Sequence, residues 1–137
     1  MKRKKLLVIF FTFICMFAMA VPSFASMRAS DQIRDYLVDV KSDNREIYID
    51  FSVTGKGGMD RIGCESIRIY ESSNGSLVES FDEDDAGMSR SNTFKYANMI
   101  TADCQVGTRY RVEVTIFAEN SAGRDTRSQT FYVTGQA

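Results

Sequence analysis

Apolar and polar residues alternate with a period near two from residue 45 to the end of the chain. Because successive side chains of a strand point to opposite faces, this period predicts half-buried β-strands and no helix. The side chains expected to point inward are Tyr36, Val38, Val40, Ile47, Ile49, Phe51, Val53, Ile67, Ile69, Phe94, Tyr96, Ile100, Tyr110, Val112, Val114, Ile116, Ala118, Phe131 and Val133.

Turn residues separate these runs. Asn74-Gly75 supplies the positive φ that a tight reversal needs, so we expect Leu77 to Phe81 to return as a partner strand. The run GKGG, Gly55 to Gly58, is interpreted as a flexible loop between two strands, because a phosphate-binding lysine would precede a helix. About seven short strands without a helix predict an all-β, antiparallel β-sandwich, with a barrel as the alternative.

The first 25 residues have a different pattern. A basic head, Lys2 to Lys5, precedes the apolar run 6–21, and Ser23-Phe24-Ala25 places small residues before a cut after Ala25. This order is typical of a secretory signal peptide, with an uncleaved membrane anchor as the alternative. We therefore expect a signal peptide at 1–25, a short polar lead-in at 26–35 and a single domain at 36–137, in a secreted, extracellular protein.

Removal of the leader changes the charge. The whole chain has 17 Lys and Arg against 18 Asp and Glu, and the leader holds four of the basic residues, which leaves 13 against 18 and a net charge of −5. An acidic domain of about 112 residues has no basic footprint for nucleic acid and no second membrane segment, and it is long enough for one hydrophobic core.

The segment GTRYRVEVTIFAENSAG, from Gly107 to Gly123, resembles the F strand and F–G turn of fibronectin type III modules. The resemblance implies an immunoglobulin-like fold in which Tyr110 makes the structural corner, a hydrogen bond from the tyrosine hydroxyl to the backbone upstream. Type III modules usually keep a tryptophan on strand B, and this chain has no tryptophan. The resemblance therefore indicates a different relative within the immunoglobulin-like group.

The mature chain also resembles a group of small secreted proteins of Gram-positive bacteria. The similar stretches are RASD after the leader, FSVTGKGGMDRIG with SIRIYE following it, and the late turn Gly123-Arg124-Asp125. This resemblance implies secretion and the β-sandwich fold, and it implies no activity.

Two cysteines, Cys64 and Cys104, remain once the leader takes Cys15. An even pair in an exported chain predicts a disulfide, because the residues are far apart in sequence and no histidine accompanies them as it would at many metal sites. The strand pattern puts the two at opposite ends of the fold, whereas bridged Cα atoms must lie within about 7 Å. Unpaired thiols are therefore the alternative.

The acidic run Asp82 to Asp85 has part of the spacing of a calcium loop, but Ala86 and Thr93 stand where oxygen ligands are needed. A solvated acidic loop is the preferred interpretation, calcium binding is the alternative, and we expect no metal and no cofactor.

The chain has no histidine, which excludes Ser-His-Asp and Cys-His catalysis. A carboxylate pair could still hydrolyse glycosides, but no two acids are placed to face a cleft, so we expect no enzyme activity.

The remaining candidates are side chains on the outward strand faces and in the late turn. The possible interaction surface consists of Tyr48, Tyr70, Phe117, Arg124, Asp125 and Tyr132. Exposed aromatic clusters mark surfaces for glycans or proteins, although single outward tyrosines also stabilise strands as cross-strand partners. The sequence predicts a secreted binding module for an unknown extracellular protein or glycan, with a structural, self-associating protein as the alternative and a hydrolase as a distant third.

Overall fold

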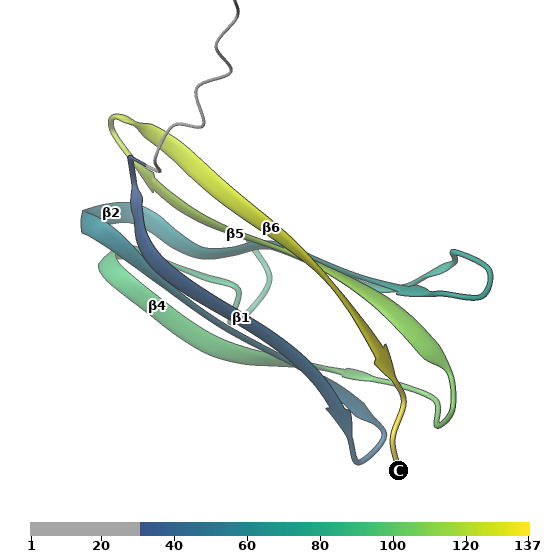
Figure 1. Cartoon of the computed structure of the whole chain (residues 1–137). Coiled ribbons are helices and arrows are strands. Elements are labelled where there is room, and N and C mark those ends of the chain that lie inside the picture. The colour runs from purple at the N-terminus through teal and green to yellow at the C-terminus, as the bar shows by residue number, and fades with distance from the viewer. Residues whose placement is uncertain (1–30) are drawn as a thin grey trace, which may run out of the picture.

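The computed structural model describes residues 31–137, so the predicted leader, its cleavage site and Cys15 lie outside the described residues. Within 31–137 the chain forms one antiparallel β-sheet and no helix (Figure 1). The strands are β1 (Ile33–Asp43), β2 (Glu46–Glu71), β3 (Leu77–Asp82), β4 (Ser89–Asp103), β5 (Arg109–Asn120) and β6 (Gly123–Thr134). The prediction of an all-β, antiparallel structure is confirmed, and so is the reversal at Asn74-Gly75, where Gly75 has a φ of 71°.

The central strand is β2, which is 26 residues long and hydrogen-bonded along both edges. One edge pairs with β1 over the first part of the strand and with β5 over the second. The other edge pairs with β4 and then with β3. Because β5 also pairs with β6, every strand joins the sheet through β2 or through a strand bonded to it.

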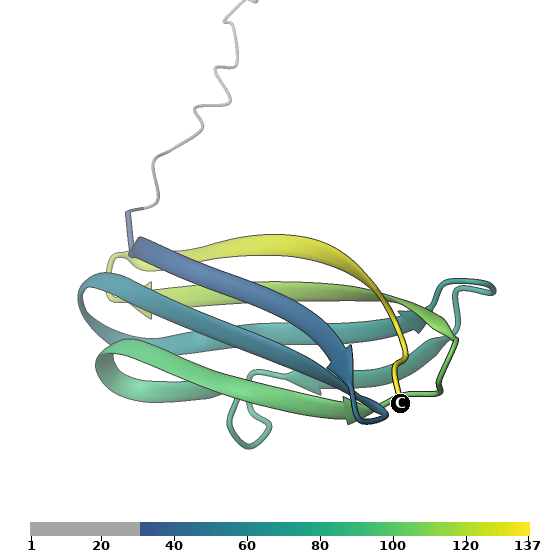
Figure 2. The same cartoon turned by 60° about the horizontal axis from the view of Figure 1, so that its bottom comes forward.

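The sheet bends where the register between β2 and β4 shifts. Thr54 pairs with Lys95 and the next pair is Met59 with Thr93, so the four residues Gly55–Gly58 lie opposite Phe94 alone. The sheet curls at this bulge, and the two halves of β2 run on different sides of the fold (Figure 2). The expected loop at GKGG is thus a bulge inside one strand, and the described residues form six strands where about seven were expected.

Both halves of the curled sheet contribute to the core between them. The buried side chains include Val40, Ile47, Ile49, Phe51, Val53, Met59, Ile62, Cys64, Ile67, Ile69, Met88, Ile100, Tyr110, Val112, Val114, Ile116 and Ala118. The predicted inward faces of β2 and β5 are confirmed. The prediction for Phe94 is wrong, because this side chain is 60% exposed where the bulge leaves it without a partner on β2.

Hydrogen bonds donated by backbone N–H groups at both ends hold the edge strands β1 and β6 beside each other. At one end Gln32 N donates to Asp125 Oδ2 at 2.7 Å. At the other end Arg45 N donates to Gln136 O at 2.7 Å, and Gln136 N donates to Ser42 Oγ at 3.0 Å. These bonds close the curl of the sheet.

Gly63 marks a close backbone approach. It has a φ of 150°, and a Cβ atom placed there would lie 2.3 Å from Met88 O and 2.7 Å from Ser89 Cα. The neighbouring Cys64 N donates to Met88 O at 2.7 Å, which fixes the chain after β3 against β2. Only glycine meets both constraints at this position.

We expect Gly63→Ala to lower the free energy of unfolding by about 3 kcal/mol, because the methyl group would displace the backbone of Met88 and Ser89. Urea denaturation followed by circular dichroism measures the change. Gly57→Ala is the matched control, since a Cβ atom there meets nothing within 4 Å. Equal stability of the two variants would contradict the close approach.

Candidate functional site

The six residues predicted as an interaction surface do not form one surface. Tyr70 and Tyr132 lie on the outer face of the half-sheet made by β3, the second half of β2, β5 and β6. Tyr48 lies on the outer face of the other half, between β1 and β4. Phe117, Arg124 and Asp125 take part in contacts within the protein.

Phe117 points outward from β5 as expected, but its exposed fraction is 0%. The guanidinium carbon of Arg124 lies 3.9 Å from the centroid of the Phe117 ring. Arg124 is held there by carboxylates of Glu65, Glu83 and Glu119, at 3.5, 3.1 and 3.6 Å. The prediction that Phe117 is an exposed contact is therefore wrong, because an arginine from the neighbouring strand covers the ring.

The acidic run Asp82 to Asp85 is largely exposed, as expected of a solvated loop, and Glu83 and Asp84 also bind an arginine. Arg61 forms ion pairs with Glu83 at 3.3 Å and with Asp84 at 2.7 Å, and it donates to Glu83 O at 3.0 Å. The bond to the Asp84 carboxylate raises the pKa of Arg61 further above its ordinary value. Within residues 31–137, no group of three or more His, Cys, Asp or Glu side chains is arranged to hold a metal ion.

The turn Gly123-Arg124-Asp125 is also used internally. Asn120 pairs with Gly123, so the reversal between β5 and β6 consists of two residues only, and the tripeptide belongs to β6. Asp125 Oδ2 accepts the hydrogen bond from Gln32 N at the start of β1. These contacts leave Arg124 and Asp125 committed to the fold, contrary to the expectation of an interaction site.

Tyr110 is buried at the start of β5, and its hydroxyl accepts a hydrogen bond from Gln105 N at 2.8 Å. The bond runs to the backbone five residues upstream, which is the geometry expected of the corner. It fixes the crossing from β4 to β5.

Cys64 and Cys104 are both free, so the predicted disulfide is wrong in this structure. Cys64 lies in the core opposite Ile116, where burial raises the pKa of its thiol to about 12. Cys104 lies beside Tyr110 and within 3.5 Å of Ser42 Oγ. Because the six residue steps from Tyr110 to Ile116 span about 20 Å of strand, the thiols lie too far apart to bond.

A row of apolar and aromatic side chains crosses the outer face of the four strands β3, β2, β5 and β6. Leu77 pairs with Tyr70, Tyr70 with Arg111, and Arg111 with Tyr132. We call these four residues the tyrosine row. Both ends are open to solvent, with Leu77 52% and Tyr132 57% exposed.

Arginines lie against both tyrosines of this row. The guanidinium carbon of Arg111 is 4.5 Å from the Tyr70 ring centroid, and that of Arg109 is 5.2 Å from the Tyr132 centroid. Arg111 also pairs with Glu113 at 3.3 Å, whereas Arg109 has no ion pair with any residue in 31–137. The row therefore offers aromatic faces together with guanidinium donors, the side chains enriched at binding hot spots.

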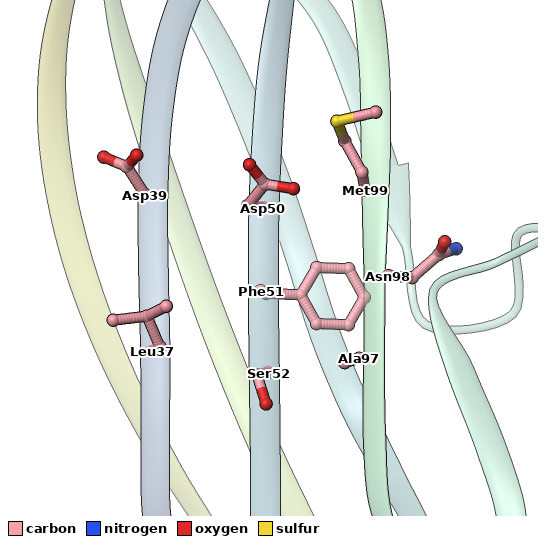
Figure 3. Close-up of a pocket in the computed structure, with 8 residues that line it drawn as sticks. All are labelled: Leu37, Asp39, Asp50, Phe51, Ser52, Ala97, Asn98 and Met99. Atoms are coloured by element: carbon pink, nitrogen blue, oxygen red, sulfur yellow. The ribbon is translucent and has the colours of Figure 1, made fainter.

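The outer face of the opposite half-sheet is acidic and hollowed (Figure 3). A depression of about 450 Å³ lies over β1, β2 and β4, lined by Leu37, Asp39, Asp50, Phe51, Ser52, Ala97, Asn98 and Met99. Asp39 and Asp50 occupy paired positions on neighbouring strands, and like charges in such positions repel. Sequence reasoning missed this face, although the alternation already placed Asp50 on the outward side.

Tyr48 lies on the same acidic face, next to this depression. Its hydroxyl donates to Glu46 Oε2 at 2.9 Å, and this hydrogen bond raises the pKa of Tyr48. Tyr48 is therefore remote from Tyr70 and Tyr132, and its hydroxyl already has a hydrogen-bond partner in Glu46.

Comparison with known protein families and with curated proteins finds no match to this chain. Among residues 31–137 there is no helix long and apolar enough to cross a membrane.

Alkylation distinguishes the two thiols. We expect iodoacetamide to modify Cys104 in the folded protein and both cysteines in denaturant without reductant, because Cys64 is buried with its pKa raised to about 12. Intact mass spectrometry counts the adducts. A need for reductant before the second adduct forms would show a disulfide instead.

Arg124→Ala should lower the free energy of unfolding by about 2 kcal/mol, because it uncovers Phe117 and leaves the carboxylates of Glu65 and Glu83 without their shared partner. Arg127→Ala is the control, since among residues 31–137 the Arg127 side chain bonds only the adjacent Thr126 O. Thermal unfolding of both variants tests the difference. A loss no larger than that of the control would rule out this role.

Proposed function

We propose that this protein is a secreted binding module, an immunoglobulin-like β-sandwich related to fibronectin type III modules and exported by its signal peptide. The curled antiparallel sheet with a core between its halves supports the sandwich. The hydrogen bond of Tyr110 to the Gln105 backbone supports the immunoglobulin-like group. The basic head, apolar run and small residues before position 26 support export.

The tyrosine row is the contact surface in this proposal, and its open, in-register arrangement is the observation that carries it. Elsewhere on the outer faces, Phe117 is covered by Arg124 and Tyr48 is bonded to Glu46. Tyr132 is instead 57% exposed and Tyr70 is half-buried, although a guanidinium group lies over one face of each ring.

The partner that fits this surface is an extracellular protein or glycan with acidic groups. The tyrosine rings supply area for planar or apolar contact at little cost in side-chain entropy. Arg109, which has no carboxylate partner among the described residues, supplies a charge for a carboxylate or phosphate of the ligand.

Self-association remains the second candidate, because β4 is 15 residues long and pairs with β2 alone. A free strand edge of this length can pair with another copy. Lys95 and the left-handed Asn92, with a φ of 55°, interrupt the edge and oppose such pairing. Sedimentation velocity separates the two candidates, since assembly through β4 gives oligomers whose size grows with protein concentration.

We expect the double variant Tyr70→Ala/Tyr132→Ala to weaken binding to its partner at least about tenfold while the protein stays folded, because both rings lie on the outer face. The measurement is pull-down of purified mature protein with cell-wall polymers, acidic and neutral glycans and secreted proteins, followed by titration of any partner found.

Tyr48→Ala is the matched control, because it removes a tyrosine from the opposite face. Equal binding by the double variant and the wild type would overturn the assignment of the surface. A monomeric wild type that retains none of these materials would overturn the binding function itself.

A further inference from the structure

The bulge at the bend of β2 borders a second hollow, away from the tyrosine row. It is a shallow hollow of about 470 Å³ that is largely open to solvent. Its lining comes from three strands: Arg34 of β1, Gly55, Lys56, Gly57 and Gly58 of β2, and Asn92, Thr93 and Phe94 of β4. We call it the bulge pocket.

Two cations border the bulge pocket without a partner. Arg34 and Lys56 are both exposed, and neither forms an ion pair with a residue that the structure describes. They differ in this from Arg61 and Arg124, whose guanidinium groups bind carboxylates of the protein itself. The charge of the bulge pocket is therefore available to an anion from outside.

Two glycines of the bulge pocket are required neither by packing nor by a positive φ. Gly55 is required by packing, since a Cβ atom there would lie 2.7 Å from Met59 Cγ. A Cβ atom at Gly57 or Gly58 would meet nothing within 4 Å, and neither residue has a positive φ. Glycine inside a strand marks a bulge, a tight bend or a place where a ligand approaches closely, and the bare backbone here combines the bulge with open space that a ligand can enter.

Phe94 adds an aromatic ring to the same hollow. It is a large apolar side chain that is 60% exposed, opposite the bulge. An exposed ring beside cations offers a stacking surface to the apolar face of a sugar. The neighbouring Asn92 has a φ of 55°, a left-handed conformation that is costly for a residue other than glycine and that clusters at binding sites.

We propose that the bulge pocket binds a phosphate group carried on a sugar. A phosphate has enough oxygens to accept bonds from Arg34, from Lys56 and from the backbone at Gly57-Gly58 together. Phe94 contacts the sugar. The hollow is of the size that accommodates a small ligand. This site does not depend on the tyrosine row, so either can fail without the other.

The test is a titration of ¹⁵N-labelled mature protein with glucose 6-phosphate, inorganic phosphate, glucuronic acid and glucose, followed by amide chemical shifts. We expect glucose 6-phosphate to shift the amides of Lys56, Gly57 and Gly58, inorganic phosphate to shift them more weakly, and glucose to leave them unchanged. Shifts of equal size with glucuronic acid would show that a carboxylate binds as well as a phosphate, and this result would overturn the proposed ligand class. No shift with either phosphate would overturn the site.

Variants separate the contributions. Arg34→Gln and Lys56→Gln should each raise the Kd for glucose 6-phosphate about five- to tenfold, and Lys41→Gln, an exposed lysine away from the bulge pocket, should not. Phe94→Ala should weaken the binding of glucose 6-phosphate but leave the binding of inorganic phosphate unchanged.

Gly57→Val tests the bare backbone. We expect unchanged thermal stability, because the space is empty, and at least tenfold weaker binding, because the side chain fills the hollow. Unchanged binding would show that the backbone takes no part. Should this variant unfold, Gly58→Ala provides the same test with a single methyl group.

Discussion

The constraint on which the whole structure depends is that one strand, β2, must serve both halves of the sheet. Its residues Glu46 to Thr54 are bonded on both edges by β1 and β4, and its later residues by β5 on one edge and by β4 and β3 on the other. A flat strand of this length would leave one apolar face in water. The bulge at Gly55–Gly58 bends β2, so that its two apolar halves bury each other.

The bend also decides which charges remain available on the surface. The chain after β3 crosses β2 at Gly63 and brings Glu83 to Arg61 and Arg124. Arg124 covers Phe117, and both arginines form ion pairs with the acidic loop. The tyrosine row at one end of β2 and the bulge pocket at the bend keep their exposed cations, Arg109, Arg34 and Lys56, without an ion pair to any described residue, and the proposed binding depends on these two surfaces.

Period-two alternation predicted the inward faces of β2 and β5, and Asn74-Gly75 predicted the hairpin. Both predictions succeed because the side of the strand to which a residue points, and the turn type, depend on the local sequence. The alternation could not show what covers an outward residue. Phe117 faces outward as predicted and is buried by Arg124, and Phe94 keeps the inward phase but is exposed, because the bulge removes its partner. The GKGG run has the composition of a turn, and only the continuing ladder from Met59 to Gly63 shows that the strand does not end there. Free cysteines follow from the strand map, whereas compositional reasoning favoured a bridge.

The glycines of β2 show how a fold and a binding site can be told apart. Gly55 and Gly63 lack side chains because protein atoms already occupy the space, at Met59 Cγ and at Met88 O. Gly57 and Gly58 lack them where the space is empty. In a strand, each glycine weakens the structure through the entropy lost on folding, so two adjacent ones without an internal contact stabilise nothing that the protein itself contains. The bend of β2 needs the bulge, but packing does not require glycine at positions 57 and 58. Arg34 and Lys56, which have no ion pair with a described residue, lie beside this empty space, where an external ligand can bind.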